Sequence, residues 1–294
     1  MSESLIDYTH FVLEATGGCT KCSSGCRDCW AIKAVHRLAC NPLTKDRWSG
    51  LVTADGKNWT GKIKTFPDML HRPRHRRKPS IWFIDSKADL FHEKVPFNYL
   101  CKVIQMIHDC PQHIFLILTK RPDRAAAFFS FHRSSLGQSL KQYCLPGNLW
   151  FGITCENQTA WDLRWPYLKL IPAGIWFVSH EPALGRIVYD DKFLARGSRS
   201  WIITGGESGR TARPMHPDWV RQDRDQCLAH NIPFFFKQWG EWLPTGKPQT
   251  IYVKDEGFRY INGDECFERV GKKSAGCCLD GKYWNQYPGE MYNG

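Results

Sequence analysis

The sequence predicts an α/β fold, built as a complete or partial (β/α) TIM-type barrel with a C-terminal extension. Short apolar runs recur roughly 25 to 35 residues apart, which is the length of a strand, a helix and two turns. Segments with helical spacing lie between these runs, and polar side chains follow each run at once. Near-continuous apolar strands are typical of a parallel sheet covered by helices. The 294 residues suffice for one such domain.

The first predicted strand, residues 11–13, leads into a cysteine-rich loop that a helix over residues 31–38 follows. The loop carries its thiols within eleven residues, at Cys19, Cys22, Cys26 and Cys29. Zinc ribbons usually separate their two cysteine pairs by roughly 12 to 20 residues, whereas here three residues separate them. An iron-sulfur cluster fits this crowding better, because it can be held at separate corners from one short loop. A zinc site and a loop of free thiols are the alternatives.

The thirteen cysteines and the lack of an apolar leader segment indicate a reducing compartment, so we expect free thiols and a cytoplasmic protein. No apolar run approaches the roughly 20 residues of a membrane helix. The formal net charge of +11 favours polyanionic partners such as nucleic acid or phosphate-bearing substrates, although a merely basic enzyme has the same composition.

Residues 40–80 are rich in polar and basic residues and are expected to form a long surface excursion. It ends in a basic stretch, residues 71–78, that is either a solvated loop or a patch that contacts phosphates.

The remaining strands are predicted at the apolar runs 81–84, 114–118, 149–153, 175–178, 201–203 and 234–236. Helical spacing appears over residues 97–107, and over residues 219–227 before His230 and Asn231 end the element. In parallel β/α folds the carboxyl ends of the strands build the active site. The alternation of strands and helices stops after Trp239, so we expect a barrel domain over 1–240 and an extension packed on it over 241–294. Within the extension we expect a hairpin, formed by residues 250–253 and 258–261 around a turn at 255–257.

A series of short segments resembles the phage Gp37/Gp68 family (DUF5131), whose members are also described as three-Cys-motif proteins and are similar to radical SAM enzymes. The segments run in order along nearly the whole chain: 18–21, 24–26, 29–31, 86–91, 118–122, 150–157, 179–182, 205–209, 213–215, 233–240, 271–273 and 279–281.

This resemblance implies a TIM-barrel-like fold with a [4Fe-4S] cluster on Cys19, Cys26 and Cys29. S-adenosylmethionine (SAM) would chelate the iron that lacks a protein ligand, and reduction would cleave it to a 5′-deoxyadenosyl radical. Cys22 stands where the family is expected to carry an aliphatic residue. Cys22 is then either a bystander or a fourth ligand that would block SAM from the cluster.

The polar residues after the strands are the candidates for the remaining roles. The turn Gly205-Gly206-Glu207 is compared with the glycine-glycine-glutamate turn that holds SAM in radical SAM enzymes, although Asp85 to Asp89 occupies the place of that turn in chain order. We predict cofactor-binding roles for Ser86, Asp89, Thr119, Gly205, Gly206 and Glu207. We predict catalytic roles for Lys120, Glu207 and Lys237, and substrate-binding roles for Arg121, Glu156, Asn157, Glu181, Gln238 and Trp239.

These observations lead to the hypothesis of a SAM-dependent radical enzyme that acts on a nucleic acid, a nucleotide or another anionic substrate. The expected partners are an electron donor and a separate three-Cys-motif protein, without a membrane. Two alternatives are a metal-dependent nuclease or lyase, and a non-catalytic binding protein whose cluster staples the loop.

Overall fold

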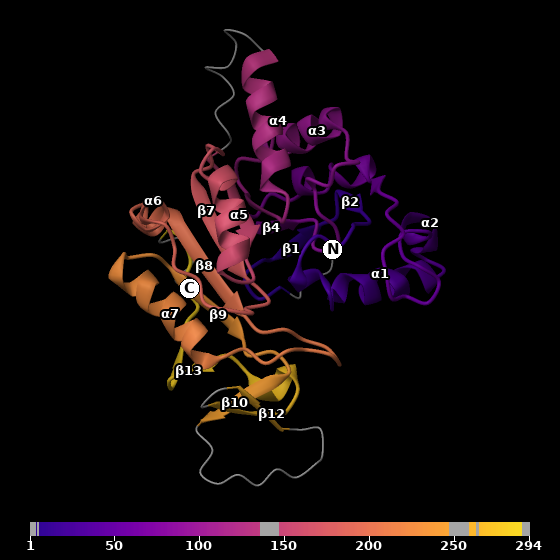
Figure 1. Cartoon of the computed structure of the whole chain (residues 1–294). Helices are drawn as coiled ribbons and strands as arrows, with labels where there is room; N and C mark the ends of the chain where they lie inside the picture. The colour runs from indigo at the N-terminus through magenta and orange to yellow at the C-terminus, as the bar shows by residue number, and fades with distance from the viewer. Residues whose placement is uncertain (1–3, 5, 136–146, 247–258, 263–264, 290–294) are drawn as a thin grey trace. The chain divides into compact units, whose positions relative to one another are not determined.

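The structure is a computed structural model that describes residues 4, 6–135, 147–246, 259–262 and 265–289 (Figure 1). The chain divides into two compact units. The first unit comprises residues 1–153 and 164–176, and the second comprises residues 154–163 and 177–294.

Parallel strands form the centre of the first unit. Their hydrogen-bonding order is β1-β4-β5-β6, which is also their order along the chain. Phe11 pairs with Trp82 and Ile84 pairs with Ile117, and every side chain of β4 is buried. The strands are β1 (Phe11–Leu13), β4 (Ile81–Ile84), β5 (Ile114–Thr119) and β6 (Leu149–Thr154), and the helices between them are α3 (Phe97–His108) and α4 (Pro122–Ser135). The observed pairing confirms these predicted strands, and near-continuous apolar runs are typical of parallel strands that helices cover on both faces.

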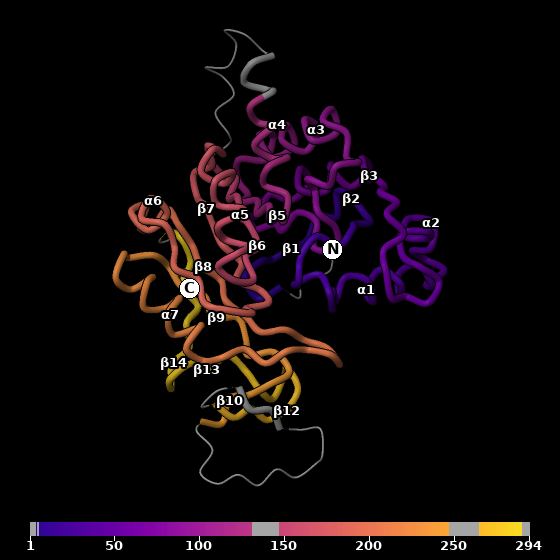
Figure 2. The backbone as a smooth tube through the Cα atoms, in the orientation of Figure 1, coloured from indigo at the N-terminus to yellow at the C-terminus, as the bar shows by residue number. Residues whose placement is uncertain are grey.

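The segment between β1 and β4 folds into more than the surface excursion that its composition predicts (Figure 2). Ile32 and Val35 of α1 pack with Trp48, Leu51 and Phe66 in a small buried cluster. Its elements are β2 (Thr16–Gly17), η1 (Ser24–Cys26), α1 (Trp30–Cys40), α2 (Lys45–Trp48), β3 (Lys64–Thr65), η2 (Pro67–Met69) and η3 (Pro73–His75). The few apolar residues of this polar segment thus suffice for a local core, because they pack against the face of α1 that carries Ile32 and Val35.

The second unit contains β7, β8 and β9, which hydrogen-bond in chain order. β8 and β9 are parallel, with Ile203 opposite Phe235. Along the chain, the elements after β6 are α5 (Gln158–Leu168), β7 (Ile175–His180), α6 (Asp191–Leu194), η5 (Gly197–Arg199), β8 (Ser200–Gly205), α7 (Pro217–Ala229) and β9 (Phe234–Gln238). The predicted helix over 219–227 is confirmed as α7, whose end at His230 is followed by Asn231 with a positive φ of 54°.

A fully buried polar network links α7 to the strands of this unit. Asp223 accepts hydrogen bonds from His180 Nδ1 at 2.7 Å, Thr204 Oγ1 at 2.6 Å and Tyr189 OH at 3.1 Å. A carboxylate without exposure needs such donors to remain in the core, so this network fixes the position of α7 against β7 and β8.

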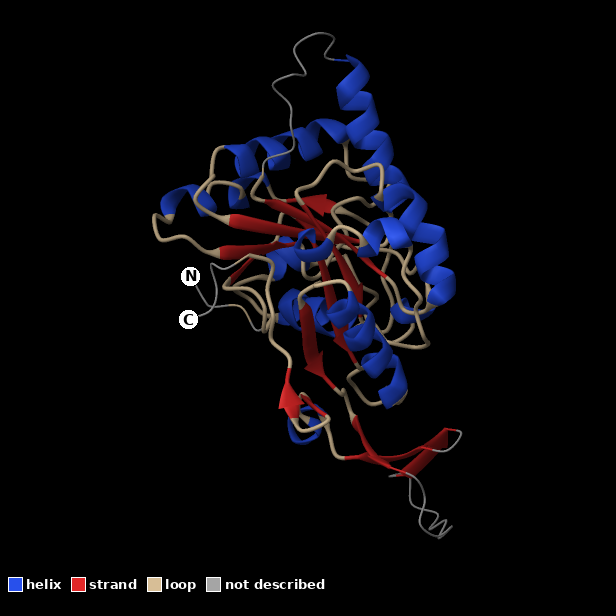
Figure 3. Cartoon of the chain, turned by 90° about the vertical axis from the view of Figure 1, so that its left-hand side faces the viewer, coloured by secondary structure: helices blue, strands red, loops and turns tan. Residues whose placement is uncertain are grey.

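After β9 the chain forms small antiparallel sheets, shown as short red strands in Figure 3. β11 pairs antiparallel with β12, whereas the predicted partner strand 250–253 and the turn 255–257 lie outside the described residues. The elements are β10 (Trp242–Gly246), β11 (Arg259–Asn262), β12 (Glu265–Arg269), α8 (Lys272–Ala275), β13 (Cys278–Leu279) and β14 (Lys282–Tyr283). Asn285 bridges antiparallel to Phe235, so the tail lies along β9.

The fold is therefore mixed α/β, with parallel strands in chain order and helices between them. This arrangement is compatible with a partial barrel, while closure into a complete TIM-type barrel and the domain boundary at residue 240 stay predictions. Within the described part of the chain, none of the helices has the length and apolar character needed to cross a membrane.

Candidate functional site

The cysteine loop follows β1 and β2 and ends at the first residue of α1. Gly18 opens it with φ of +90°, and a Cβ at this position would lie 2.1 Å from the carbonyl oxygen of Lys62, so no larger residue fits. A parallel bridge joins Gly18 to Ala88 beyond β4. Cys26 closes η1, and Cys29 is the N-cap of α1. The thiols of Cys19, Cys26 and Cys29 therefore come from three separately anchored pieces of one loop. Cys19 and Cys29 are partly exposed, Cys26 is buried and Cys22 is exposed.

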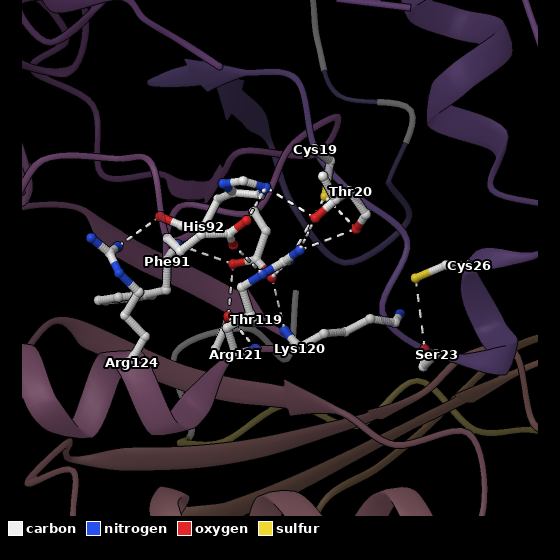
Figure 4. Close-up of polar contacts among 12 residues, drawn as sticks. Cys19, Thr20, Ser23, Cys26, Phe91, His92, Thr119, Lys120, Arg121 and Arg124 are labelled. Carbon is white, nitrogen blue, oxygen red and sulfur yellow. Dashed lines mark hydrogen bonds and ion pairs between the residues drawn. The ribbon is translucent and has the colours of Figure 1, made fainter. Parts of the chain in front are cut away.

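Arg121 is the residue that holds this loop to the ends of β4 and β5 (Figure 4). Its Nη2 donates to Thr20 Oγ1 at 2.8 Å and to the Thr20 carbonyl at 3.1 Å. Its Nη1 donates to Asp89 Oδ2 at 3.0 Å and lies 3.8 Å from Cys19 Sγ. A guanidinium offers several donors in a rigid plane, so one side chain can fix both the loop and the acid.

Asp89 is buried and accepts three further hydrogen bonds. Thr119 Oγ1 donates to Oδ1 at 2.7 Å, the Phe91 amide donates to Oδ1 at 3.0 Å, and the Lys120 amide donates to Oδ2 at 3.0 Å. These donors and the Arg121 guanidinium leave the carboxylate fully engaged in bracing the loop. The predicted cofactor contacts at Asp89 and Thr119 stay predictions, and we assign to both residues the role of positioning Arg121 and the start of α4.

The electrostatics of the loop separate its thiols. Burial, reinforced by Asp89, raises the pKa of the Cys19 thiol to about 12, and burial also raises the pKa of Cys29. Cys22 donates a hydrogen bond to Cys26, which lowers the pKa of Cys26, and the nearby Lys120 ammonium lowers it further. The same hydrogen bond raises the pKa of Cys22. Figure 4 shows the Lys120 side chain extended in the direction of Ser23 and Cys26, so a cation accompanies the thiols.

A second acidic site lies beside this network in the same unit. Ser86 Oγ donates to Glu14 Oε1 at 2.6 Å, and Lys87 Nζ forms an ion pair with the same carboxylate. Asp85, with φ of 60°, accepts from the amides of Ala15 at 2.6 Å and Thr16 at 2.8 Å. Ser86 therefore joins the end of β4 to the segment that follows β1, and its predicted cofactor contact stays a prediction.

The candidates of the second unit follow the strands β6, β7, β8 and β9. Lys237 Nζ lies 3.0 Å from Glu181 Oε1. Glu207 receives a two-pronged ion pair from Arg213, with Nη2 to Oε1 at 2.6 Å and Nε to Oε2 at 2.8 Å. Glu156, which is buried, and Asn157 follow β6. Lys237 is thus paired with Glu181, and Glu207 is paired with Arg213.

The turn after β8 is shaped by close backbone packing. A Cβ on Gly206 would lie 1.9 Å from the carbonyl oxygen of Trp239, which excludes any other residue there. Gln238 Nε2 donates to the Gly206 carbonyl at 2.8 Å, and its buried Oε1 has no hydrogen-bond partner among the described residues. Trp239 is buried and donates through Nε1 to the Cys278 carbonyl at 3.0 Å. Trp239 therefore packs in the interior of this unit and Gly206 permits a tight turn, while their predicted roles in binding stay predictions.

The network also contains residues that the sequence reasoning missed. His92 Nε2 lies 3.0 Å from Thr20 Oγ1, and Arg124 donates to the His92 carbonyl at 2.7 Å and to the Val95 carbonyl at 2.6 Å. Arg124 could have been found because it lies in the first turn of α4, three residues after Arg121. Thr20 and His92 carried no signal, since their meeting depends on the fold.

Within the described part of the chain, no three His, Cys, Asp or Glu side chains gather as ligands of a single metal ion. The fold and the loop define an α/β protein with a braced cysteine loop at the carboxyl ends of parallel strands. Residues 3–288 match the family described as "Protein of unknown function (DUF5131)", and because the match spans almost the whole chain, the protein belongs to this family. No curated protein and no solved structure matches the chain.

Proposed function

We propose that this protein is a SAM-dependent iron-sulfur enzyme of the radical type that acts on a nucleic acid, a nucleotide or a similar anionic substrate. The observation that carries the proposal is the braced loop with Cys19, Cys26 and Cys29 at the edge where parallel strands end. In β/α folds this edge is where the reacting groups gather. Reductive cleavage of SAM is the chemistry that the bound cluster would supply.

The donor set fits a four-iron cluster. Cysteine thiolates are the ligands of such clusters, and a cluster is held at separate corners rather than at one point. The three cysteines belong to three separately anchored pieces of the loop, as a ligand set for separate corners requires. The short sequence between them and the small residues of the loop allow its backbone to fold around one centre.

The chain's own residues would hold and electrostatically balance that loop. Arg121 positions Cys19 through Thr20, and Asp89 holds Arg121. Lys120 supplies positive charge beside Cys26, which favours the thiolate form that binds iron. Removing any of these supports should weaken the retention of the cluster before it affects the rest of the fold.

One observation favours the alternative of a non-catalytic cluster that staples the loop. Cys22 is hydrogen-bonded to Cys26, so its sulfur lies beside one of the three proposed ligands. If Cys22 bound the fourth iron, no position would be left for SAM. The nuclease or lyase hypothesis requires a divalent metal instead, and the same loading experiment separates it.

The decisive experiment is anaerobic reconstitution with iron and sulfide, followed by iron analysis and EPR of the reduced protein with and without SAM. We expect a [4Fe-4S]⁺ signal that SAM shifts, together with 5′-deoxyadenosine as a product. The single variants Cys19→Ala, Cys26→Ala and Cys29→Ala should each lose the signal. Cys22→Ala is the matched control from the same loop and should keep both the signal and the shift.

The outcomes that contradict the proposal are equally specific. A signal that SAM does not change in the wild type but does change in Cys22→Ala would identify Cys22 as the fourth ligand. That result would favour the alternative of a non-catalytic protein in which the cluster only holds the loop together. Zinc in place of iron, with SAM left intact, would end the radical hypothesis. Circular dichroism of each variant shows whether a lost signal reflects unfolding.

A further inference from the structure

The exposed side of helix α1 carries one aromatic and two basic side chains beside the cysteine loop. Trp30, Lys33 and Arg37 are all exposed and follow one another at spacings of three and four residues. Such spacing places side chains within one face of a helix. The helix starts directly after Cys29 and contains no acidic residue. The proposed cluster site therefore continues into a basic surface with an aromatic ring at its near end.

Trp30 lies outside the buried cluster that α1 forms with the segment before β4. It is 52% exposed, and no ring contact or hydrogen bond involves its side chain among the described residues. The opposite face of α1 packs Ile32 and Val35 into the buried cluster with Trp48. An aromatic ring with about half of its surface in water, directly after Cys29 of the proposed cluster site, is available to stack on an unpaired base.

The two cations are also uncommitted. Neither Lys33 nor Arg37 forms a side-chain hydrogen bond or ion pair with any residue that the structure describes, and both are exposed. Other cations nearby have partners: Arg27 pairs with Asp28 at 2.7 Å. Four residues of helix separate the two charges by about 6 Å along the axis. They can therefore neutralise neighbouring charges of a polyanion without giving up an internal contact.

We propose that Trp30, Lys33 and Arg37 form a docking surface for a single-stranded nucleic acid, which leads the strand to the cysteine loop. Trp30 stacks on an unpaired base, and Lys33 and Arg37 contact the phosphates. A duplex keeps its bases stacked on one another, so the ring selects single strands or loops. This inference rests on the proposed function and specifies its substrate class.

The basic stretch 71–78 is the competing surface, and the topology places it elsewhere. It enters β4 at the amino end of that strand, whereas the cysteine loop follows the carboxyl end of the parallel strand β1. The two surfaces therefore lie at opposite edges of the parallel strands. Within the stretch, Arg74 pairs with Asp109 and Arg76 donates to Ser80 Oγ at 2.7 Å. Arg77 and Lys78 are exposed, and they provide a control pair of equal charge.

The test is fluorescence anisotropy of a labelled 20-nucleotide single strand, as DNA and as RNA, titrated with the full chain at several salt concentrations. Trp30→Ala should weaken binding about 5- to 150-fold, and Trp30→Phe should restore most of it. Lys33→Gln/Arg37→Gln should lower the slope of log K against log salt by about 1.4. Arg77→Gln/Lys78→Gln should leave both the affinity and the slope near the wild-type values.

Three results would overturn the inference. The first is a loss in the Arg77/Lys78 control that equals the loss in the α1 pair. The second is a Trp30→Ala variant that binds like the wild type. The third is equal competition by polyglutamate, which would make α1 a surface for an acidic protein. Binding is measured without SAM or reductant, so a protein that binds through α1 but never cleaves SAM disproves only the proposed function, and the reverse result disproves only this inference.

Discussion

Replacing Arg121 tests whether one side chain holds the cysteine loop. In Arg121→Ala the hydrogen bonds to Thr20 Oγ1 at 2.8 Å, to the Thr20 carbonyl at 3.1 Å and to Asp89 at 3.0 Å are lost together. A hydrogen bond to a charged group contributes about 1.5 to 3 kcal/mol, but the three share one donor group and are not additive. Asp89 keeps three other hydrogen-bond donors, so its buried carboxylate is not left without partners. We therefore expect a loss of about 3 kcal/mol, near the lower end of the range for breaking a buried ion pair.

That loss corresponds to a decrease of the melting temperature by about 6 to 12 °C for a unit of this size. Arg121→Lys keeps the charge but not the planar fork, so an intermediate decrease is expected. Arg77→Ala, which removes an exposed arginine, should change the free energy of unfolding by no more than about 0.5 kcal/mol.

A second readout separates loosening of the loop from general destabilisation. Lys21 and Arg27 are exposed within the loop and are trypsin sites. Without the Arg121 contacts to Thr20, cleavage at these two sites should accelerate well below the melting temperature, as mass spectrometry of the fragments would show. If Arg121→Ala melts and is cleaved like Arg77→Ala, the bracing role of Arg121 is refuted.

Two further predictions concern a glycine and a histidine. Gly206→Ala should destabilise the protein by several kcal/mol or prevent its folding, because the new Cβ would lie 1.9 Å from the Trp239 carbonyl oxygen. Gly174→Ala is the control, since the atom nearest to its new Cβ would lie at 3.5 Å. In a thermal scan this control should melt within a few degrees of the wild type. Burial lowers the pKa of His113, whose Nε2 lies 3.0 Å from the Pro73 carbonyl, so the unfolded chain binds a proton more readily and the free energy of unfolding falls as the pH drops below about 6.5. The stabilising term is fully present above that pH, and His113→Gln should flatten the dependence of the melting temperature on pH between about 7.5 and 5. An unchanged pH dependence in this variant would contradict the assignment.

Local patterns in the sequence determined most of the fold. The apolar runs at 81–84 and 114–118 are strands, as their short length and their isoleucine and aromatic residues predicted for a covered parallel sheet. The spacing in α1 and α7 likewise predicted helices whose apolar sides are buried. The close spacing of Cys19, Cys26 and Cys29 singled out the loop, since proximity within a few residues needs no knowledge of the fold.

The tertiary structure alone decided what each polar residue contacts. Asp89 and Arg121 were both predicted to bind ligands, yet the fold turns them toward one another across 32 residues of chain. Glu207 meets Arg213, and Gly206 meets the backbone of Trp239, although no periodicity relates these positions. The physical reason is that the end of a strand fixes the backbone position of a residue but does not determine which other residue its side chain contacts. The partner is set by the packing of separate β/α elements, and that packing depends on every buried side chain between them.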